Sequence, residues 1–379
     1  MRIALSAGLI QDNVRGGDVY FRNLAAALSR IDGENEYFLF GYVFRQHPRR
    51  TAAIPCPEHP NFRRLIKRWP QGLVLRAEKD WGLPVVESYL RTQQIELYHE
   101  PGPMLPNLRV IPALATFHDL IPFSRPELVE GSTLQRWQAS GRDAAERARL
   151  ILASSTATKN DLMEHLKVPA EKIRVAILGV DRETYRPLHD REALAAVRRR
   201  LGLPERFLLS VGPYEKRRNW EGLLRAAAAL ETDRPYGVVL TGGIPAAARA
   251  GLLRLAGELG LEARVVLTGY LPDADLPAIY NLAAAFVYPS FYDGFNLPLI
   301  EAMACGAPVV VSAEGALPEI AGDAAVFVDP HDRDSIVDGV KRALAAAPEL
   351  REKGRRRAAE LTWERTAQAT LRAYREAAA

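Results

Sequence analysis

Short apolar runs rich in Val, Ile, Leu and Phe alternate along the chain with longer stretches of helical periodicity. In the first half, six such runs predict strands, at residues 3–5, 37–40, 95–98, 114–117, 150–153 and 173–177. Helices are predicted between them, at residues 19–30, 85–92, 134–147 and 157–166. The segment Phe62–Ile66 fits either a strand or the start of a helix. Continuous apolar strands alternating with helices are typical of a parallel sheet covered on both faces.

The alternation pauses near Gly179-Val180-Asp181, and the stretch Tyr185-Arg186-Pro187 has the composition of a linker. A second series follows, with strands predicted at 207–211, 238–241, 265–268, 285–288, 309–312 and 326–328. Its helices are predicted at 220–230, 246–259, 276–283, 297–304 and 333–345, and a last amphipathic helix covers about 364–377. We therefore expect an α/β protein with two doubly wound Rossmann-like domains. The first spans 1–182 and is rejoined by 363–379, and the second spans 183–362.

Composition narrows the class of protein without changing this picture. The 379 residues are 48% apolar and 25% charged, with a net charge of +4, which is too small to indicate a nucleic-acid partner. No apolar run reaches the ~18 residues of a membrane span, and the N-terminus enters a strand without a signal-peptide pattern. The two cysteines, Cys56 and Cys305, are far apart. These features predict a cytoplasmic protein without a disulfide framework.

The most informative segment lies between the predicted strand ending at Tyr288 and the predicted helix beginning at Leu297. A polar turn that contains Asp293 and Gly294 joins them, and the free backbone amides at a helix N-terminus can bind phosphate or sugar oxygens. Glu301 follows about one turn into the helix, so both carboxylates can accept hydrogen bonds from sugar hydroxyls. From residue type alone, both acids could instead simply complement the positive end of the helix dipole.

This segment, residues 288–308, resembles the acidic-x7-acidic motif of the retaining GT-B glycosyltransferases of family 4. Asp293 matches the first acid and Glu301 the second. Further similar motifs follow in order along nearly the whole chain: the glycine turn Gly16-Gly17, His118-Asp119-Leu120-Ile121-Pro122, Val211-Gly212 through Arg217-Arg218-Asn219, Thr268-Gly269-Tyr270-Leu271-Pro272 and Leu317-Pro318-Glu319. The resemblance implies a GT-B enzyme with an interdomain cleft that transfers a hexose from a nucleoside-diphosphate sugar without a metal or cofactor.

The resemblance also implies a role for each matching residue. Glu301 would bind the ribose and Asp293 the donor sugar, and Arg217 and Arg218 would bind the diphosphate. The backbone amides of the helix start would contact the sugar and distal phosphate, and Tyr270 would line the base. Gly16 and Gly17 would let backbone approach the diphosphate, and His118 would lie near the donor sugar. The implied catalytic groups are His118, Asp293 and Arg218, and the donor-binding set adds Gly16, Gly17, Gly212, Arg217, Tyr270, Gly294, Phe295, Asn296, Leu297 and Glu301.

Three departures from the family pattern leave the donor open. Asp293 stands where Glu is commoner, Arg218 where Lys is usual, and Asn296 where Gly is commoner. The implied donors are GDP-mannose or a UDP-hexose, with GDP-mannose ahead, and the acceptor is a hydroxyl of a glycan, glycolipid or small molecule. This is the activity of a mannosyltransferase of bacterial polysaccharide biosynthesis. The same departures motivate an alternative, a nucleotide-sugar-binding protein of this fold that does not transfer.

Two acidic pairs and one basic stretch have other interpretations. Asp273-Ala274-Asp275 and Asp332-Arg333-Asp334 precede predicted helices, so they are predicted N-caps rather than metal ligands. The histidines lack ligand spacing, and no metal is expected. Residues 41–80 carry a local excess of basic groups, and Phe62–Trp69 mixes them with apolar residues. This segment predicts a solvated helix face, with two alternatives: a peripheral contact with anionic membrane at the inner face, or a seat for an anionic acceptor.

Overall fold

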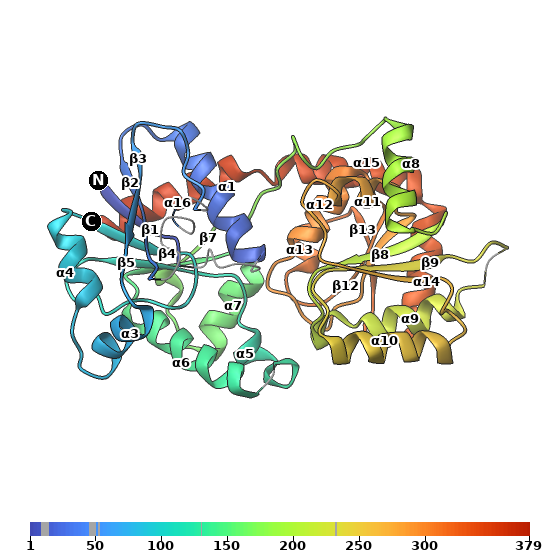
Figure 1. Cartoon of the computed structure of the whole chain (residues 1–379), viewed down its shortest axis with the longest axis horizontal. Helices are drawn as coiled ribbons and strands as arrows, with labels where there is room; N and C mark the ends of the chain where they lie inside the picture. Colours follow the sequence, from blue (N-terminus) through green and yellow to red (C-terminus); the bar gives the residue numbers. More distant parts are fainter. Residues whose placement is uncertain (9–14, 45–50, 52–53, 130, 232) are drawn as a thin grey trace. The chain divides into compact units, whose positions relative to one another are not determined.

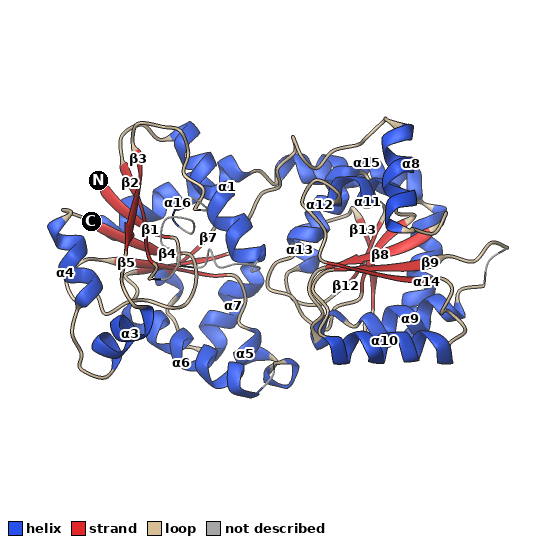
Figure 2. Cartoon of the chain, in the orientation of Figure 1, coloured by secondary structure: helices blue, strands red, loops and turns tan. Residues whose placement is uncertain are grey.

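The chain forms two compact units, each built around its own parallel sheet. The computed structural model describes residues 1–8, 15–44, 51, 54–129, 131–231 and 233–379. Unit 1 comprises Met1–Leu178 together with Trp363–Ala379, and unit 2 comprises Gly179–Thr362 (Figure 1). Helices cover both faces of each sheet (Figure 2). The expected α/β architecture of two Rossmann-like domains is confirmed. We expected the boundary between the two domains at 182/183, and the structure divides the two units at 178/179.

The sheet of unit 1 has seven strands in the order β3-β2-β1-β4-β5-β6-β7, and all neighbouring pairs are parallel. Its central strands are buried along their length because helices cover both faces. The strands are β1 (Arg2–Ser6), β2 (Glu36–Tyr42), β3 (Phe62–Lys67), β4 (Leu97–Glu100), β5 (Ala113–Phe117), β6 (Leu150–Ala153) and β7 (Ile173–Val175).

The C-terminal helix belongs to unit 1, where it packs beside α1. An ion pair joins Arg30 to Glu364 at 2.6 Å, and Thr366 donates its hydroxyl hydrogen to the carbonyl of Ile177 at 2.7 Å. The helices of unit 1 are α1 (Arg15–Ile31), α3 (Gln71–Lys79), α4 (Val85–Thr92), α5 (Ile121–Ser124), α6 (Gly131–Arg147), α7 (Thr156–His165) and α16 (Trp363–Ala378), with the 3-10 turns η1 (Pro126–Leu128) and η2 (Ala170–Lys172). Both ends of the chain therefore lie in the same unit (Figure 1).

The sheet of unit 2 has six parallel strands in the order β10-β9-β8-β11-β12-β13. They are β8 (Phe207–Val211), β9 (Gly237–Thr241), β10 (Val265–Gly269), β11 (Ala285–Tyr288), β12 (Val309–Ser312) and β13 (Ala325–Val328). The chain runs outward from β8 in one direction and from β11 in the other. In open parallel sheets of this kind, ligands bind at the carboxyl ends of the two strands where the order reverses.

Helices pack on both faces of this second sheet (Figure 2). They are α8 (Arg191–Leu201), α9 (Trp220–Ala229), α10 (Ala246–Glu258), α11 (Leu276–Leu282), α12 (Leu297–Cys305), α13 (Leu317–Ala321), α14 (Arg333–Ala345) and α15 (Ala347–Glu360), with the 3-10 turn η3 (Lys216–Arg218). Trp220, which is 1% exposed, anchors α9 to the sheet, and its indole N–H donates to the Ser210 hydroxyl at 3.1 Å. The turn preceding α9 is thereby fixed close to the end of β8.

Several elements differ from expectation. The ambiguous segment at Phe62–Ile66 is the edge strand β3, so its interpretation as a helix face is wrong. Helices α3, α5, α8, α13 and α15 were not predicted. Within the basic stretch 41–80, residues 45–50 and 52–53 lie outside the described part of the chain. Among the helices of the described residues, none is both long and apolar enough to span a bilayer.

Candidate functional site

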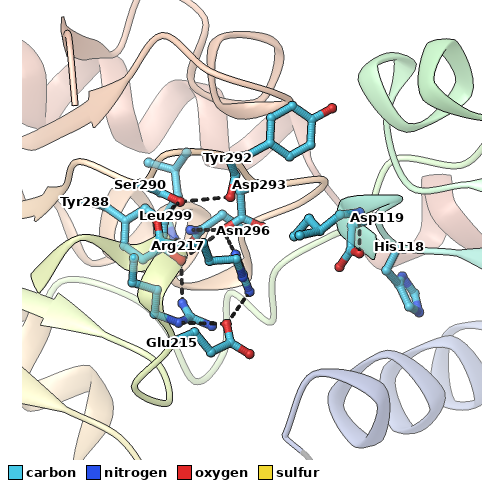
Figure 3. Close-up of polar contacts among 12 residues, drawn as sticks. His118, Asp119, Glu215, Arg217, Tyr288, Ser290, Tyr292, Asp293, Asn296 and Leu299 are labelled. Carbon is cyan, nitrogen blue, oxygen red and sulfur yellow. Dashed lines mark hydrogen bonds and ion pairs between the residues drawn. The ribbon is translucent and has the colours of Figure 1, made fainter. Parts of the chain in front are cut away.

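The loops after β8 and β11 bring the predicted donor-binding residues together at the switch point of unit 2 (Figure 3). The 3-10 turn η3 follows β8 and carries Arg217 and Arg218, while the loop after β11 carries Asp293. The nitrogen Nη1 of Arg217 donates to Oδ2 of Asp293 at 2.8 Å. Residues separated by some 75 positions in sequence thus form one buried cluster.

Asp293 is the centre of this cluster and is 3% exposed. Its Oδ2 also accepts hydrogen bonds from the hydroxyl of Tyr288 at 2.9 Å and from Nδ2 of Asn296 at 3.2 Å (Figure 3). Burial raises the pKa of Tyr288 well above its ordinary value, so the phenol remains a hydrogen-bond donor. Three hydrogen-bond donors therefore hold the carboxylate in one orientation. They also offset the free-energy cost of burying it, which would be large for an unpaired carboxylate.

Arg218 lies beside this cluster and is itself 8% exposed. Its guanidinium donates to the Tyr288 hydroxyl, and Cζ lies 5.5 Å from the centre of the Tyr288 ring. A Cβ atom added at Gly212 would come within 2.5 Å of Cζ of Arg218, and the φ of Gly212 is +134°. Only glycine fits here, both because of this backbone conformation and because the guanidinium fills the space of a side chain.

Glu215 is a member of the cluster that the sequence analysis missed. Its Oε2 lies 2.7 Å from Nη2 of Arg217 and 3.3 Å from Nε of Arg218 (Figure 3). The Glu215 side chain is 42% exposed, whereas those of the two arginines are 13% and 10% exposed. One half-exposed carboxylate thus contacts both of the cations that were predicted to bind an anion.

Asn296 caps helix α12. Its Oδ1 accepts from the backbone N–H of Leu299 at 2.9 Å, which satisfies one of the free amides of the first turn. Because its Nδ2 donates to Asp293, the side chain joins the helix start to the carboxylate. Gly294, Phe295 and Leu297 lie on either side of this cap in the same turn. The departure from the family's glycine therefore has a structural role in this chain.

Glu301 lies apart from the Asp293 cluster, where α11 packs against α12. It is 7% exposed, and its Oε2 accepts from the hydroxyl of Tyr280 at 2.8 Å. Burial, followed by the charge of Glu301, raises the pKa of Tyr280 well above its ordinary value. Burial also raises the pKa of the neighbouring Cys305 thiol. The structure therefore joins Asp293 with the arginines and gives Glu301 a separate partner.

The remaining predicted residues of unit 2 include one correction. Tyr270 follows β10 and is 54% exposed. Asp275 occupies the N-cap position of α11 without a capping hydrogen bond from its side chain, and its two oxygens instead accept from Arg200 at 2.6 and 3.1 Å. The predicted N-cap position of Asp275 is confirmed, but the expected capping hydrogen bond is absent because the Arg200 guanidinium takes the carboxylate. Asp332 does cap α14, through the N–H of Asp334 at 2.8 Å.

In unit 1, His118 follows β5 with both ring nitrogens occupied. Nδ1 lies 2.7 Å from the hydroxyl of Ser154, and Nε2 lies 3.2 Å from the carbonyl of Pro101. Since the carbonyl can only accept, this arrangement assigns the proton to Nε2. Burial lowers the pKa of His118 to about 4, so the ring is neutral near pH 7. The backbone carbonyl of His118 accepts from the Thr158 hydroxyl at 3.3 Å.

The predicted glycine turn of unit 1 is helical instead. Gly16 and Gly17 lie in the first turn of α1, and a Cβ added at Gly16 would meet no atom within 4 Å. Interpreting these glycines as a turn is therefore wrong. The residues directly before them, 9–14, lie outside the described part of the chain.

Unit 1 also holds a buried acid that sequence reasoning missed. Glu100 ends β4, is 4% exposed, and accepts from the Tyr98 hydroxyl at 2.9 Å. Burial raises its pKa to about 7. Its position at the end of a buried strand was the available signal. Within the residues that the structure describes, no three His, Cys, Asp or Glu side chains are grouped so that they could bind a metal ion.

Comparison with known proteins covers both units. The family described as Glycosyltransferase Family 4 matches residues 14–184, and Glycosyl transferases group 1 matches residues 196–361. The chain is 33% identical over 296 residues to an O-antigen chain mannosyltransferase B of Escherichia coli, covering 76% of each protein. It is 31% identical over 264 residues to the serotype-specific mannosyltransferase WbdA of E. coli, covering 68% of this chain but only 32% of WbdA.

Solved structures resemble the whole chain. A sucrose-phosphate synthase from Thermosynechococcus elongatus aligns with a TM-score of 0.77 at 23% identity, over 99% of this chain and 98% of that one. Anabaena Alr3699/HepE, in complex with UDP and glucose, aligns with a TM-score of 0.74 at 17% identity, over 99% and 100% of the two chains. At these identities the likeness supports the two-domain fold.

Proposed function

This chain belongs to the glycosyltransferases of family 4, and we propose that it transfers a hexose from a nucleoside-diphosphate sugar to an acceptor hydroxyl with retention of configuration. The observation that carries the proposal is the cluster of Arg217, Arg218 and Asp293 at the switch point of unit 2. Two cations beside a helix start are suited to a diphosphate, and a fixed carboxylate is suited to sugar hydroxyls.

In this proposal, the diphosphate takes the place of the Glu215 carboxylate on the two arginines. Phosphate oxygens accept from both guanidinium forks, and Glu215, at 42% exposure, moves into solvent. As the sugar–phosphate bond breaks, negative charge grows on the leaving phosphate. Cations already in position stabilise that charge without further rearrangement.

Asp293 and Glu301 have distinct roles in the proposal. Asp293, oriented by Tyr288 and Asn296, accepts hydrogen bonds from the donor sugar. Glu301 accepts from the ribose, and the Tyr280 hydroxyl keeps its carboxylate in place. The amides of Gly294, Phe295 and Leu297 contact sugar and phosphate, and Tyr270 contacts the base. The roles of His118, Gly16 and Gly17 in donor binding remain predictions.

The identities of the donor and the acceptor are proposals that rest on the relatives. The similarity to an O-antigen chain mannosyltransferase favours GDP-mannose, and the UDP complex of the Anabaena structure keeps UDP-hexoses as the alternative. A glycan or lipid-linked acceptor is expected on the same ground. Transfer is proposed to need neither metal nor cofactor, since the arginines supply the positive charge. A cytoplasmic location at the inner membrane face remains a prediction.

The test is incubation with GDP-mannose, UDP-glucose and UDP-galactose, with and without glycan acceptors. Acceptor-dependent release of nucleoside diphosphate, unchanged by a chelator, is expected. An α-linked product from an α-linked donor, read from the anomeric signals in an NMR spectrum, would demonstrate retention. Donor binding without turnover on any acceptor would instead favour the binding protein.

A variant pair tests the site itself. Glu301→Ala should weaken donor affinity, because a ribose hydroxyl then loses its acceptor inside a buried site. Glu258→Ala is the matched control, since that side chain is 63% exposed on α10 of the same unit. Donor affinity measured by calorimetry should fall about tenfold or more for the first and stay unchanged for the second. Equal affinities in both variants would refute the role of Glu301.

A further inference from the structure

A basic cavity opens at the amino-terminal edge of the sheet of unit 1. Its volume is about 480 Å³, and it lies beside the start of β5, at Ala113, and the residue before β6, Arg149. His118 follows the opposite, carboxyl end of β5, so the cavity is separate from the edge that the family motif occupies. Four of its lining residues are cations: Arg109, Arg147, Arg149 and Lys172, here called the basic pocket.

The charges of the basic pocket are only partly neutralised by the protein. Lys172 donates to two backbone carbonyls at the end of α6, those of Ala145 and Glu146, both at 2.8 Å. Burial lowers its pKa, although the nearby Glu146 charge opposes this shift. Arg109 donates to the carbonyl of Gly82.

Arg147, in the basic pocket, forms an ion pair with Asp143, whose carboxylate is half exposed. No Asp or Glu is among the residues that line the cavity in the described part of the chain. An anion entering it would therefore meet cations without first displacing a lining carboxylate.

Large apolar side chains stand exposed around this pocket. Trp81 is 69% exposed, Leu83 is 49% exposed and Val110 is 69% exposed; we call these three residues the apolar rim. Val110 lines the cavity directly. The turn between Trp81 and Leu83 is tied to the pocket, because the Gly82 carbonyl accepts from Arg109 and from Nδ2 of Asn107 at 2.9 Å. The apolar rim is therefore joined to the basic pocket through Val110 and through the contact of the Gly82 carbonyl with Arg109.

We propose that this surface docks on an anionic lipid bilayer, with a lipid phosphate in the basic pocket and the apolar rim inserted at the headgroup level. Tryptophan favours that level of a bilayer, because its ring is apolar and its N–H can remain hydrated. Arginine matches the phosphate group with its planar fork of donors. The apolar rim distinguishes this surface from a site for a free phosphate compound, since such a ligand would gain nothing from exposed Trp81 and Leu83.

A second basic element of unit 1 lies on its edge strand. The segment Phe62–Lys67 is edge strand β3, with Phe62 buried and Arg63 exposed. Lys67 lies over the ring of Tyr89, with Nζ 4.5 Å from its centre. Arg63 is exposed and is not among the residues that line the basic pocket, so it provides the matched control for a change of charge in the same unit.

The test is co-sedimentation of the full chain with vesicles of equal parts phosphatidylglycerol and phosphatidylcholine. Pure phosphatidylcholine vesicles and glycerol phosphate in solution serve as the comparison probes. The protein should bind the anionic vesicles in a salt-sensitive manner, and pure phosphatidylcholine much more weakly. Arg149→Glu should weaken binding about 25-fold, at about fivefold for each unit of charge, and Trp81→Ala about tenfold or more. Arg63→Glu should bind as the unaltered chain does.

Three results would overturn the proposal. If Arg63→Glu weakened vesicle binding as much as Arg149→Glu does, the binding would be a non-specific attraction between charges. Failure to sediment with anionic vesicles would exclude docking. Saturable binding of glycerol phosphate without vesicle binding would assign the pocket to a soluble anion. All variants alter exposed side chains, so unchanged thermal midpoints serve as the folding check. Because vesicle binding is measured without a sugar donor, its failure would leave the proposed transfer reaction untouched.

Discussion

The substitution Asp293→Asn is expected to destabilise unit 2 by about 2–3 kcal/mol. It removes the charge of a side chain that is 5% exposed while keeping its shape. Two charges 4 Å apart near a protein surface attract by about 4 kcal/mol. Arg217 would lose that partner but would keep Glu215 at 2.7 Å, so the loss should fall below the ~3–5 kcal/mol typical of an abandoned buried charge.

The matched control is Asp275→Asn in the same unit. Asp275 is also paired with an arginine, Arg200, from which it accepts two hydrogen bonds, but the side chain of Arg200 is 54% exposed. Water can therefore replace the lost carboxylate, and the expected cost is about 0–1 kcal/mol. The two substitutions make the same chemical change, and they differ in how far solvent screens the ion pair.

The assay is hydrogen exchange of the full chain, followed by mass spectrometry of peptides from α12 and, separately, α11. The free energy of opening from each peptide reports the loss near its own substitution. Urea unfolding of the same variants gives the global value. A loss below about 1 kcal/mol for Asp293→Asn, or equal losses in the two variants, would refute the claim that burial makes this pair strong.

Three further outcomes are expected. Gly212→Ala should lower the free energy of unfolding by about 1–3 kcal/mol and weaken donor affinity, because the new Cβ would overlap the Arg218 guanidinium. Gly243→Ala is the control, since its Cβ would meet nothing within 4 Å, and it should leave urea unfolding unchanged. Burial, with a smaller effect of the His118 charge, lowers the pKa of His99 to about 3, so the folded state loses stability as pH falls from about 6.5 toward 3. His99→Gln should flatten that acid limb of stability against pH, and an unchanged slope would contradict the assignment. Burial raises the pKa of Glu100 to about 7, so stability is lost as pH rises from about 4.5 to 7. Glu100→Gln should therefore gain up to about 3 kcal/mol relative to the unaltered chain across that interval in urea titrations, and no gain at pH 8 would contradict it.

The strands were predictable because burial on both faces leaves a signature in the sequence. Strands such as Phe207–Val211 and Val309–Ser312 are buried at every position, so each appears as a mainly apolar run that contains a single serine. Helices α8 and α15 gave no such signal, since both are rich in charged residues and α8 has no buried residue. Phe62–Lys67 was ambiguous because an edge strand with one buried residue and several basic residues resembles a helix start as closely as a strand.

The candidate site was predictable only in its residue types. The seven-residue spacing placed Asp293 in a turn and Glu301 in a helix, and both lie where that spacing implies. Their partners depend on three-dimensional arrangement. Tyr288 reaches Asp293 because it ends a buried strand one turn before it, and Tyr280 reaches Glu301 because α11 packs on α12. No local pattern specifies such pairs, since they require the packed sheet.

Glu215 explains why two arginines can be buried at this edge before any donor binds. Each would carry a large desolvation cost if it were left unpaired, and the single Glu215 carboxylate contacts both. Because Glu215 is much more exposed than either arginine, leaving this contact costs it little solvation. A diphosphate can therefore replace it at the cost of one exposed ion pair, while the Tyr288 and Asp293 contacts keep both guanidinium groups in place. On this reasoning the Glu215 carboxylate, in the loop after β8, occupies the place of the donor diphosphate until a donor binds.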